Sequence, residues 1–321
     1  MLPTALKEAI SRAVQGLAHG DIAPHSEKLS DHYRRGGTSN VLADRLGIAA
    51  YLLVRLPATY AATHAVLAEA ARRAPDFAPK CSLDIGAGPG TASWAAADVW
   101  PEIETARLVD SNPRLLEVAR ALMADCPVPA FARPQIVNRD IETTALASAD
   151  LVIAGYSLGE IPADRLVPAV CALWEACTGL LVVVEPGTPA GFDRVRAARS
   201  ILIDRGAAIV APCPHRLACP IAAPDWCHFS ERLPRSRGHM LAKSVSVPFE
   251  DEKYSYVVAA REGIAVEPYA ARIMGPVRRS KVGLTMKLCE AGEVRTRIVA
   301  ARDRQAFSRH RRAAWGDALK G

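Results

Sequence analysis

Hydrophobic positions in the first part of the chain recur at the spacing of helices. Apolar residues between positions 6 and 17 lie three or four residues apart, and the same period continues through residues 42–53 and 60–74. Pro57 lies between the last two stretches, and proline lacks the N–H group that a helix interior needs. We therefore expect a helical N-terminal region over residues 1–75, with a break between two helices at Pro57.

From residue 81 the pattern changes to short apolar runs that alternate with amphipathic helical segments. This alternation is typical of a parallel, doubly wound sheet. Two runs, 151–154 and 180–184, are apolar throughout, as strands covered on both faces require. The expected strands are 82–85, 106–110, 135–138, 151–154 and 180–185, and the expected helices lie near 91–99, 113–123, 164–177 and 190–205.

The rhythm of strands and helices stops between residues 207 and 250. This segment is rich in proline, has no apolar period, and contains Cys213, Cys219 and Cys227. Because it cannot bury a core of its own, we expect a thiolate-ligated metal ion or iron–sulfur cluster to hold its loops together. Regular patterning then resumes with a strand at 254–260, a hairpin at 282–288 and 294–300, and a basic helix at 302–315.

A glycine-rich turn follows the first predicted strand. It reads Asp84-Ile-Gly86-Ala-Gly88-Pro-Gly90, and glycines let the backbone approach a ligand closely. The spacing Gly-x-Gly-x-Gly differs from the Gly-x-Gly-x-x-Gly of dinucleotide sites. It is the form that S-adenosylmethionine (SAM) methyltransferases show. The alternative is a Rossmann-like scaffold in which the turn is only a tight connection.

Polar residues at the ends of the next strands support the SAM prediction. Asp110 is placed to accept both ribose hydroxyls, with Ser111 and Asn112 beside it. Asp140 is placed to contact the adenine amine, and Ile141 to pack on the ring. The predicted cofactor-binding residues are Asp84, Gly86, Gly88, Gly90, Asp110, Ser111, Asn112, Asp140, Ile141 and Tyr156.

The segment after the fourth predicted strand, where methyltransferase chemistry is expected, has no recognisable catalytic motif. It contains neither an Asn/Asp-Pro-Pro-aromatic sequence nor a cysteine nucleophile. Tyr156, Ser157 and Glu160 are polar and well placed, but they could equally cap the next helix. The catalytic residues are therefore unknown, and whether the chain is an enzyme stays open.

Charge is distributed unevenly along the chain. Residues 1–190 carry 16 Lys or Arg against 21 Asp or Glu, a net charge of −5, whereas residues 191–321 carry 24 against 13, a net charge of +11. The basic C-terminal third indicates an anionic partner, most often nucleic acid. The alternative is that its arginines merely cover solvated helix faces.

Several classes of protein are disfavoured by composition. The longest apolar runs are too short to cross a bilayer, and the first 20 residues lack the apolar core of a secretory signal. We therefore expect no membrane association. Eight cysteines without such a signal favour a reducing compartment.

The metal-binding set is predicted to be Cys213, Cys219, Cys227 and Cys289. Zinc would usually show a Cys-x-x-Cys knuckle, which is missing, although His215 and His228 keep a mixed zinc site open. The other cysteines are expected to pack in cores or loops. They are Cys81, Cys126, Cys171 and Cys177.

Five blocks of this sequence resemble the Rsm22 family, methyltransferase-like proteins associated with the small ribosomal subunit of mitochondria and their bacterial relatives. The resemblance covers most of the chain from about residue 40 onward. The blocks are Arg55-Leu-Pro-Ala-Thr-Tyr60, the glycine turn from Leu83 to Thr91, Cys213-Pro-His and Cys219-Pro with Trp226-Cys-His-Phe229, Phe249-Glu-Asp-Glu-Lys-Tyr-Ser-Tyr256, and Trp315-Gly-Asp317.

The resemblance implies a 4Fe–4S cluster on the four cysteines, SAM binding, and a role in small-subunit assembly or translation. The basic third would then contact ribosomal RNA, and the protein would be a monomer off the ribosome. It would lie in the cytoplasm of a bacterium or in the mitochondrial matrix of a eukaryote. The cations expected to face RNA are Arg278, Arg279, Lys281, Arg302, Arg304, Arg309, Arg311 and Arg312.

These inferences define an α/β protein built on a Rossmann-like class I SAM methyltransferase sheet. The leading hypothesis is a cluster-containing, SAM-binding protein of the small ribosomal subunit with little catalytic turnover. The alternatives are an active methyltransferase of ribosomal RNA or a ribosomal protein, and a zinc-stabilised small-molecule methyltransferase. The expected divisions are a helical region (1–75), a methyltransferase-like domain (76–206), a Cys-rich cluster-binding insertion (207–250), and the last strands of the sheet with a basic extension (251–321).

Overall fold

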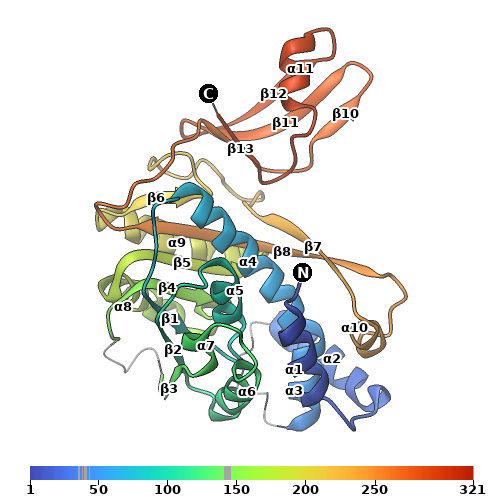
Figure 1. The fold of residues 1–321 in the computed structure, drawn as a ribbon. Coiled ribbons are helices and arrows are strands. Elements are labelled where there is room, and N and C mark those ends of the chain that lie inside the picture. Colours follow the sequence, from blue (N-terminus) through green and yellow to red (C-terminus); the bar gives the residue numbers. More distant parts are fainter. Residues whose placement is uncertain (35–36, 38, 40–41, 43, 141–145, 321) are drawn as a thin grey trace.

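Two sheets make up the protein, a large mixed sheet with helices on both faces and a small antiparallel sheet beyond one end of it (Figure 1). The small sheet and helix α11 lie at the top of Figure 1, away from the N-terminal helices. The computed structural model describes residues 1–34, 37, 39, 42, 44–140 and 146–320.

The large sheet has the order β3-β2-β1-β4-β5-β8-β6, and β7 also pairs with β8. Strands β1 to β5 are mutually parallel, as predicted, whereas β8 runs antiparallel to β5, β6 and β7. The sheet is therefore mixed. The strands are β1 (Cys81–Ile85), β2 (Thr105–Asp110), β3 (Gln135–Asn138), β4 (Ala149–Gly155), β5 (Cys177–Pro186), β6 (Ala208–Ala211), β7 (Phe229–Pro234) and β8 (Phe249–Ala260).

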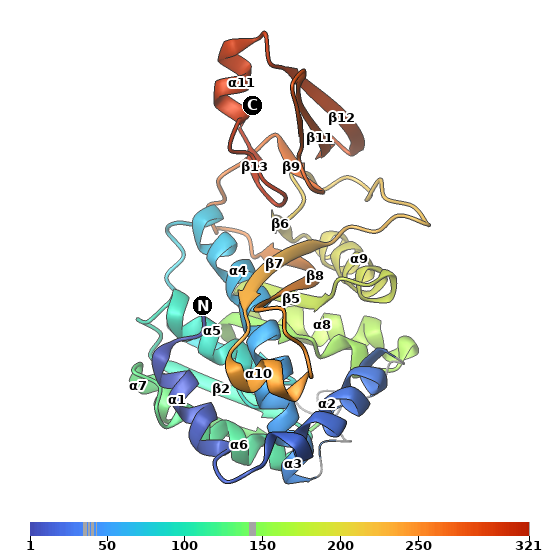
Figure 2. The same ribbon diagram turned by 90° about the vertical axis from the view of Figure 1, so that its right-hand side faces the viewer.

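Helices cover both faces of this sheet, and Figure 2 shows α4 and α9 on opposite sides of it. The continuous apolar run of β5 explains why both faces need cover. Leu180, Val182 and Val184 pack in the cluster that contains α4, and Leu181 and Val183 in the cluster that contains α9. The helices outside the N-terminal region are α5 (Thr91–Val99), α6 (Pro113–Met123), α7 (Pro129–Ala132), α8 (Leu166–Ala176), α9 (Pro189–Asp204), α10 (Arg237–Ala242) and α11 (Arg304–His310), with 3-10 turns η4 (Leu158–Glu160) and η5 (Ala163–Arg165).

The N-terminal region is helical, as predicted, but the predicted break at Pro57 is wrong. Helix α3 (Arg45–Ala50) continues through a π-helical turn, η2 (Tyr51–Arg55), into α4 (Leu56–Arg73). Pro57 lies in the first turn of α4, directly after the π turn, where its missing N–H is tolerated. The two preceding helices are α1 (Thr4–Ala13) and α2 (His19–Arg34).

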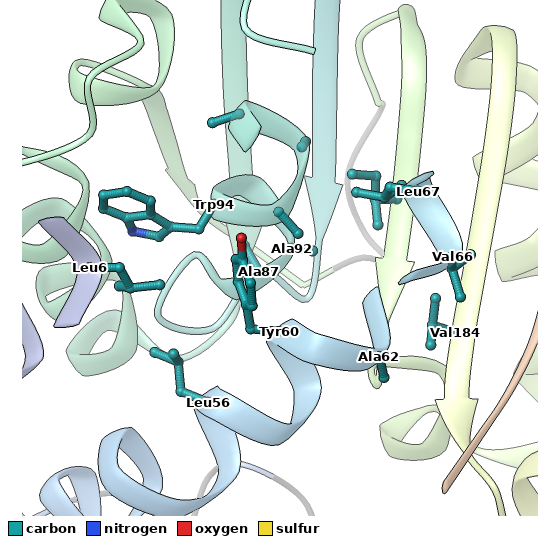
Figure 3. Close-up of a cluster of buried hydrophobic side chains, with 14 of the residues drawn as sticks. Leu6, Leu56, Tyr60, Ala62, Val66, Leu67, Ala87, Ala92, Trp94 and Val184 are labelled. Carbon is teal, nitrogen blue, oxygen red and sulfur yellow. The ribbon is translucent and has the colours of Figure 1, made fainter. Parts of the chain in front are cut away.

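Helix α4 is a core element. Figure 3 shows Tyr60 lying between Leu56 and the start of α5, with Trp94 and Ala92 nearby. The stretch Arg45–Arg73 is long and apolar enough to cross a membrane by length and composition, yet 61% of its apolar window is buried inside the protein. Its apolar character is therefore that of a core helix.

The small sheet contains the predicted hairpin. Strands β11 (Gly283–Glu290) and β12 (Glu293–Ala300) pair antiparallel, and β11 also pairs with β9 (Ala271–Ile273) and β10 (Arg278–Ser280). Strand β13 (Ala318–Leu319) pairs with β9. Of the described strands in the C-terminal part of the chain, β8 belongs to the large sheet. The hairpin of β11 and β12 belongs to the small sheet. The small sheet has its own hydrophobic core, which includes Ile273, Leu284, Met286, Leu288 and Val299.

The basic helix predicted over residues 302–315 is shorter in the structure, because α11 ends at His310. The chain then turns so that the indole N–H of Trp315 donates a hydrogen bond to the carbonyl of His228, at 3.1 Å. The guanidinium of Arg279 donates a hydrogen bond to the carbonyl of Ala313. These tertiary contacts hold the C-terminal segment in a non-helical path.

Candidate cofactor pocket and candidate metal centre

A cavity of about 350 Å³ opens at the carboxyl ends of β1, β2, β4 and β5. Ligands of open α/β sheets bind at this edge, and the volume lies in the range of small-molecule sites, about 300–1,000 Å³. Six of the predicted cofactor residues line it. They are Gly86, Gly88, Asp110, Ser111, Asp140 and Tyr156.

The glycine turn has a backbone that only glycine adopts readily. Gly86 and Gly88 have φ angles of +65° and +53°, in the left-handed region. A Cβ atom on Gly86 would lie 2.3 Å from the Cβ of Ser157. The segment after β4 therefore packs directly on the turn, and a side chain at position 86 would separate the two walls of the cavity.

Asp110 is held by the backbone of two neighbouring turns. Its Oδ2 accepts the N–H of Gly88 and its Oδ1 accepts the N–H of Asn112, each at 2.7 Å. Burial raises the pKa of Asp110, although these N–H groups act in the opposite direction. The carboxyl is therefore fixed in orientation at the cavity wall, with acceptor capacity left for a ligand hydroxyl.

Three predicted cofactor residues lie outside the cavity wall and support it from behind. Asp84 is buried and accepts hydrogen bonds from the N–H and O–H of Ser93, at 3.0 and 2.7 Å. Gly90 precedes the first turn of α5, and Asn112 caps α6 through its side chain. Ile141 lies outside the described residues.

The polar residues after β4 are engaged in structural contacts. Tyr156 has φ +59° and donates its hydroxyl to Glu252 Oε1 at 3.1 Å. Glu160 accepts from the N–H and the hydroxyl of Ser39, both at 2.9 Å. Ser157 Oγ is buried with no hydrogen-bond partner in the described part of the chain. It is therefore a group that a ligand in the cavity could satisfy.

Several lining residues were missed by sequence reasoning because they come from distant elements. Arg55 and Thr59 reach the cavity from the π turn and α4, and Glu185 and Arg194 form its far wall with an ion pair at 2.9 Å. Glu185 also accepts the N–H of Leu158, at 3.0 Å. The one sequence signal for Arg55 and Thr59 was the block Arg55-Leu-Pro-Ala-Thr-Tyr60. It resembles the Rsm22 family but had no assigned role.

The four cysteines predicted to bind metal meet at a second, small cavity. Cys213, Cys219, Cys227 and Cys289 all line it, together with His215 and residues of α9. Its volume is about 30 Å³, more than one water molecule needs. Burial raises the pKa of Cys213, and it raises that of Cys289 to about 12, with the neighbouring thiols adding to the effect. A cation is therefore needed to hold these groups as thiolates.

The donor atoms are not gathered tightly enough for a single ion. Among the described residues, no group of three or more His, Cys, Asp or Glu side chains has the arrangement of one metal site. His215 Nε2 lies 3.5 Å from Cys289 Sγ. His228 does not line the cavity and instead stacks on Trp226 and meets Trp315 edge-on. The four remaining cysteines are elsewhere, and Cys126 and Cys177 are buried in the two main cores.

The eight cations predicted to face RNA are all exposed and belong to the small sheet, α11 and the segments beside them. Arg279 also makes the contact with Ala313 described above. Arg278 and Arg279 pair with residues at the Gly283 end of β11, whereas Cys289 lies near the other end of that strand. The small sheet therefore carries both predicted features of the C-terminal third, at different ends of β11.

The mixed sheet, the glycine turn and the cavity at the strand ends define a Rossmann-like methyltransferase fold. The family described as "Mitochondrial small ribosomal subunit Rsm22" matches residues 45–320. The chain belongs to the Rsm22 family.

Relatives and solved structures with similarity to the chain include mitochondrial proteins and methyltransferases. The human mitochondrial ribosome assembly protein METTL17 is 29% identical over 84% of this chain and 61% of its own length. Rsm22-cox11 tandem protein 2 of Schizosaccharomyces pombe is 30% identical over 66% of this chain and 31% of its own length. The chain thus spans about three fifths of the first relative's length and about a third of the second's. The structure of magnesium protoporphyrin IX methyltransferase from Synechocystis PCC 6803 with bound SAH is 15% identical with a TM-score of 0.45, covering 73% of this chain and 94% of that one.

Proposed function

We propose that this chain is a small-subunit ribosome-assembly protein that binds SAM on its methyltransferase fold and a 4Fe–4S cluster on its four late cysteines. One observation carries the proposal. Three cysteines of the segment between β6 and β7 meet Cys289 of β11, in the second sheet, at one cavity. Cys289 is distant from the other three in sequence, so its convergence with them is a property of the fold.

The cavity at the strand ends fits SAM by its chemistry. Gly86 and Gly88 allow close approach of the backbone, Asp110 would accept the ribose hydroxyls, and Asp140 would accept the adenine amine. The hydroxyl of Ser157, which has no hydrogen-bond partner among the described residues, is a further donor at the same wall. When bound, SAM supplies a methyl group on its sulfonium, and these residues would bind and orient the nucleoside around it.

The cysteine cavity favours a cluster over zinc. A zinc ion binds four donors at about 2.3 Å for sulfur, so its ligands must lie close together. A 4Fe–4S cluster takes one thiolate at each of four iron atoms, so its ligands stand farther apart. The convergence of four thiols on one cavity, and the lack of the Cys-x-x-Cys knuckle usual in zinc sites, support the cluster proposal.

The basic surface supports binding to ribosomal RNA. Its exposed arginines would contact phosphates, which gives affinity that depends on salt rather than on base sequence. The human relative carries the name of a mitochondrial ribosome assembly protein. We place this chain at the small subunit, in the mitochondrial matrix if its source is eukaryotic and in the cytoplasm if it is bacterial.

Anaerobic purification tests the cluster. We expect brown protein with iron and sulfide bound, and co-sedimentation with small ribosomal subunits that weakens as salt rises. Colourless protein that contains zinc and does not sediment with the subunit would instead support a small-molecule methyltransferase.

An active methyltransferase of ribosomal RNA or a ribosomal protein is the second candidate. The cavity supports this candidate because it extends beyond the predicted cofactor residues to Arg55 and Arg194. These polar residues could contact a methyl acceptor beside SAM. Transfer of tritiated methyl groups from SAM to immature small subunits separates the two. Label above the level of a protein-free control would establish turnover.

A further inference from the structure

Arg199 of α9 is a buried cation with no anionic partner among the described residues. The Arg199 residue is 5% exposed. Its Nη2 donates to the carbonyls of His215 and Leu217, at 2.9 and 2.8 Å, in the loop between Cys213 and Cys219. Its Nε is buried with no hydrogen-bond partner, and no ion pair joins it to a carboxylate, within the described ranges.

The second buried arginine beside the cavity is different. Arg272 of β9 is 2% exposed and binds Glu69 at 2.8 Å, the carbonyl of Pro212 at 3.0 Å and the carbonyl of Gly316 at 2.7 Å. Its charge is therefore compensated by a carboxylate. The fold therefore supplies an anion for Arg272, whereas Arg199 lines the cysteine cavity and has no carboxylate partner in the described part of the chain.

An uncompensated buried charge destabilises the folded protein. Arg199 lines the cavity together with all four cysteines. Neutral thiols do not compensate a guanidinium, whereas thiolates bound to iron–sulfur or to zinc do, because four thiolates leave either centre with net negative charge. The anion that Arg199 lacks is therefore the metal-bound thiolate set itself.

We propose that Arg199 is the counter-ion of a negatively charged thiolate centre in this cavity, a positioning residue that favours the loaded state of the protein. The inference rests on the proposed metal centre and adds a residue outside the ligand set. Its Nε–H is the donor available to a sulfur atom of the centre, while Nη2 keeps the ligand-bearing loop in place.

The test compares loaded and metal-free protein. Wild type, Arg199→Met and Arg199→Lys are reconstituted anaerobically with ferrous iron and sulfide, and in parallel with Zn²⁺ alone. Two quantities are measured, the rate at which a chelator removes the metal and the melting temperature of both the loaded and the stripped chain. Arg205→Met, at the exposed end of the same helix, is the matched control.

We expect Arg199→Met to lose metal about tenfold faster than wild type, which corresponds to about 1.4 kcal/mol, while its stripped form melts at the same temperature as stripped wild type or higher. Arg199→Lys retains the charge, so it should stay within about threefold of wild type even if the methionine variant fails to fold. Arg205→Met should match wild type in both states.

Four outcomes would overturn the inference. Equal melting losses in loaded and stripped Arg199→Met would show that the residue only holds the loop carbonyls. Wild-type metal retention in that variant, or a loss in Arg199→Lys as large as in Arg199→Met, would remove the role of charge. If wild type takes up neither iron–sulfur nor zinc, the proposed centre fails and this inference fails with it.

Discussion

Arg272 and Cys289 are direct partners across the small sheet, where β9 and β11 pair antiparallel. The same guanidinium reaches Glu69 of α4 in the large domain, at 2.8 Å. One buried arginine thus connects a candidate metal ligand, the small sheet and the helix that packs across the large sheet. This contact, together with the hydrogen bond from Trp315 to His228, joins the small sheet and the C-terminal segment to the large domain.

Glu69→Gln should destabilise the protein by about 3–5 kcal/mol, because removing one partner leaves a buried charge uncompensated. Burial alone would raise the pKa of Glu69, but Arg272 outweighs it and lowers that pKa, so the carboxylate is charged in the folded state. Denaturant unfolding measures the loss. Glu104→Gln removes an exposed ion pair with Lys80 and should change the free energy of unfolding by less than about 1 kcal/mol. Similar losses in both variants would contradict the prediction.

Asp84→Asn should change how stability depends on pH. Burial raises the pKa of Asp84 from 3.8 to about 7. The folded state therefore binds a proton that the unfolded state releases, and this contribution to stability is full below pH 3.8 and is lost as pH rises to about 7. The stability of wild type relative to Asp84→Asn should fall over this range, by at most about 1.4 kcal/mol per pH unit.

Unfolding curves at a series of pH values measure this difference. Asp76→Asn alters an exposed aspartate. Its free energy of unfolding should depend on pH in the same way as that of wild type. A wild-type curve that stays parallel to that of Asp84→Asn between pH 4 and 7 would refute the assignment.

Asp110→Asn should weaken SAM binding by about 10- to 100-fold, because a hydrogen bond to a charged group contributes about 1.5–3 kcal/mol. Isothermal titration calorimetry with SAM measures the affinity. Glu117→Gln alters an exposed carboxylate on the following helix and should bind SAM like wild type. Unchanged affinity in Asp110→Asn would place the nucleoside elsewhere.

Cys219→Ser should prevent stable loading of the metal centre, since one of four thiolate ligands is lost. Iron and sulfide per chain after anaerobic reconstitution measure the loading. Cys171→Ser alters a cysteine of α8 outside the cavity and should load like wild type. Full loading of Cys219→Ser, with Cys171→Ser as the deficient variant, would reverse the ligand assignment.

Local sequence was enough to predict most of the large sheet. The apolar runs of β4 and β5, the glycine turn and Asp110 after β2 all follow from neighbours along the chain, since strand periodicity, turn geometry and capping act over a few residues. The cysteine set could be recognised for the same reason, because thiols in a proline-rich segment stand out against any core pattern.

Tertiary structure decided what no local pattern encodes. The π turn before Pro57 is stabilised by packing of the long helix, and β8 runs antiparallel because of where the chain returns to the sheet. Arg199 and Arg272 look like ordinary surface cations in the sequence. Only long-range folding buries them beside the four thiols, because burial of a charge depends on every element that surrounds it and not on its neighbours along the chain.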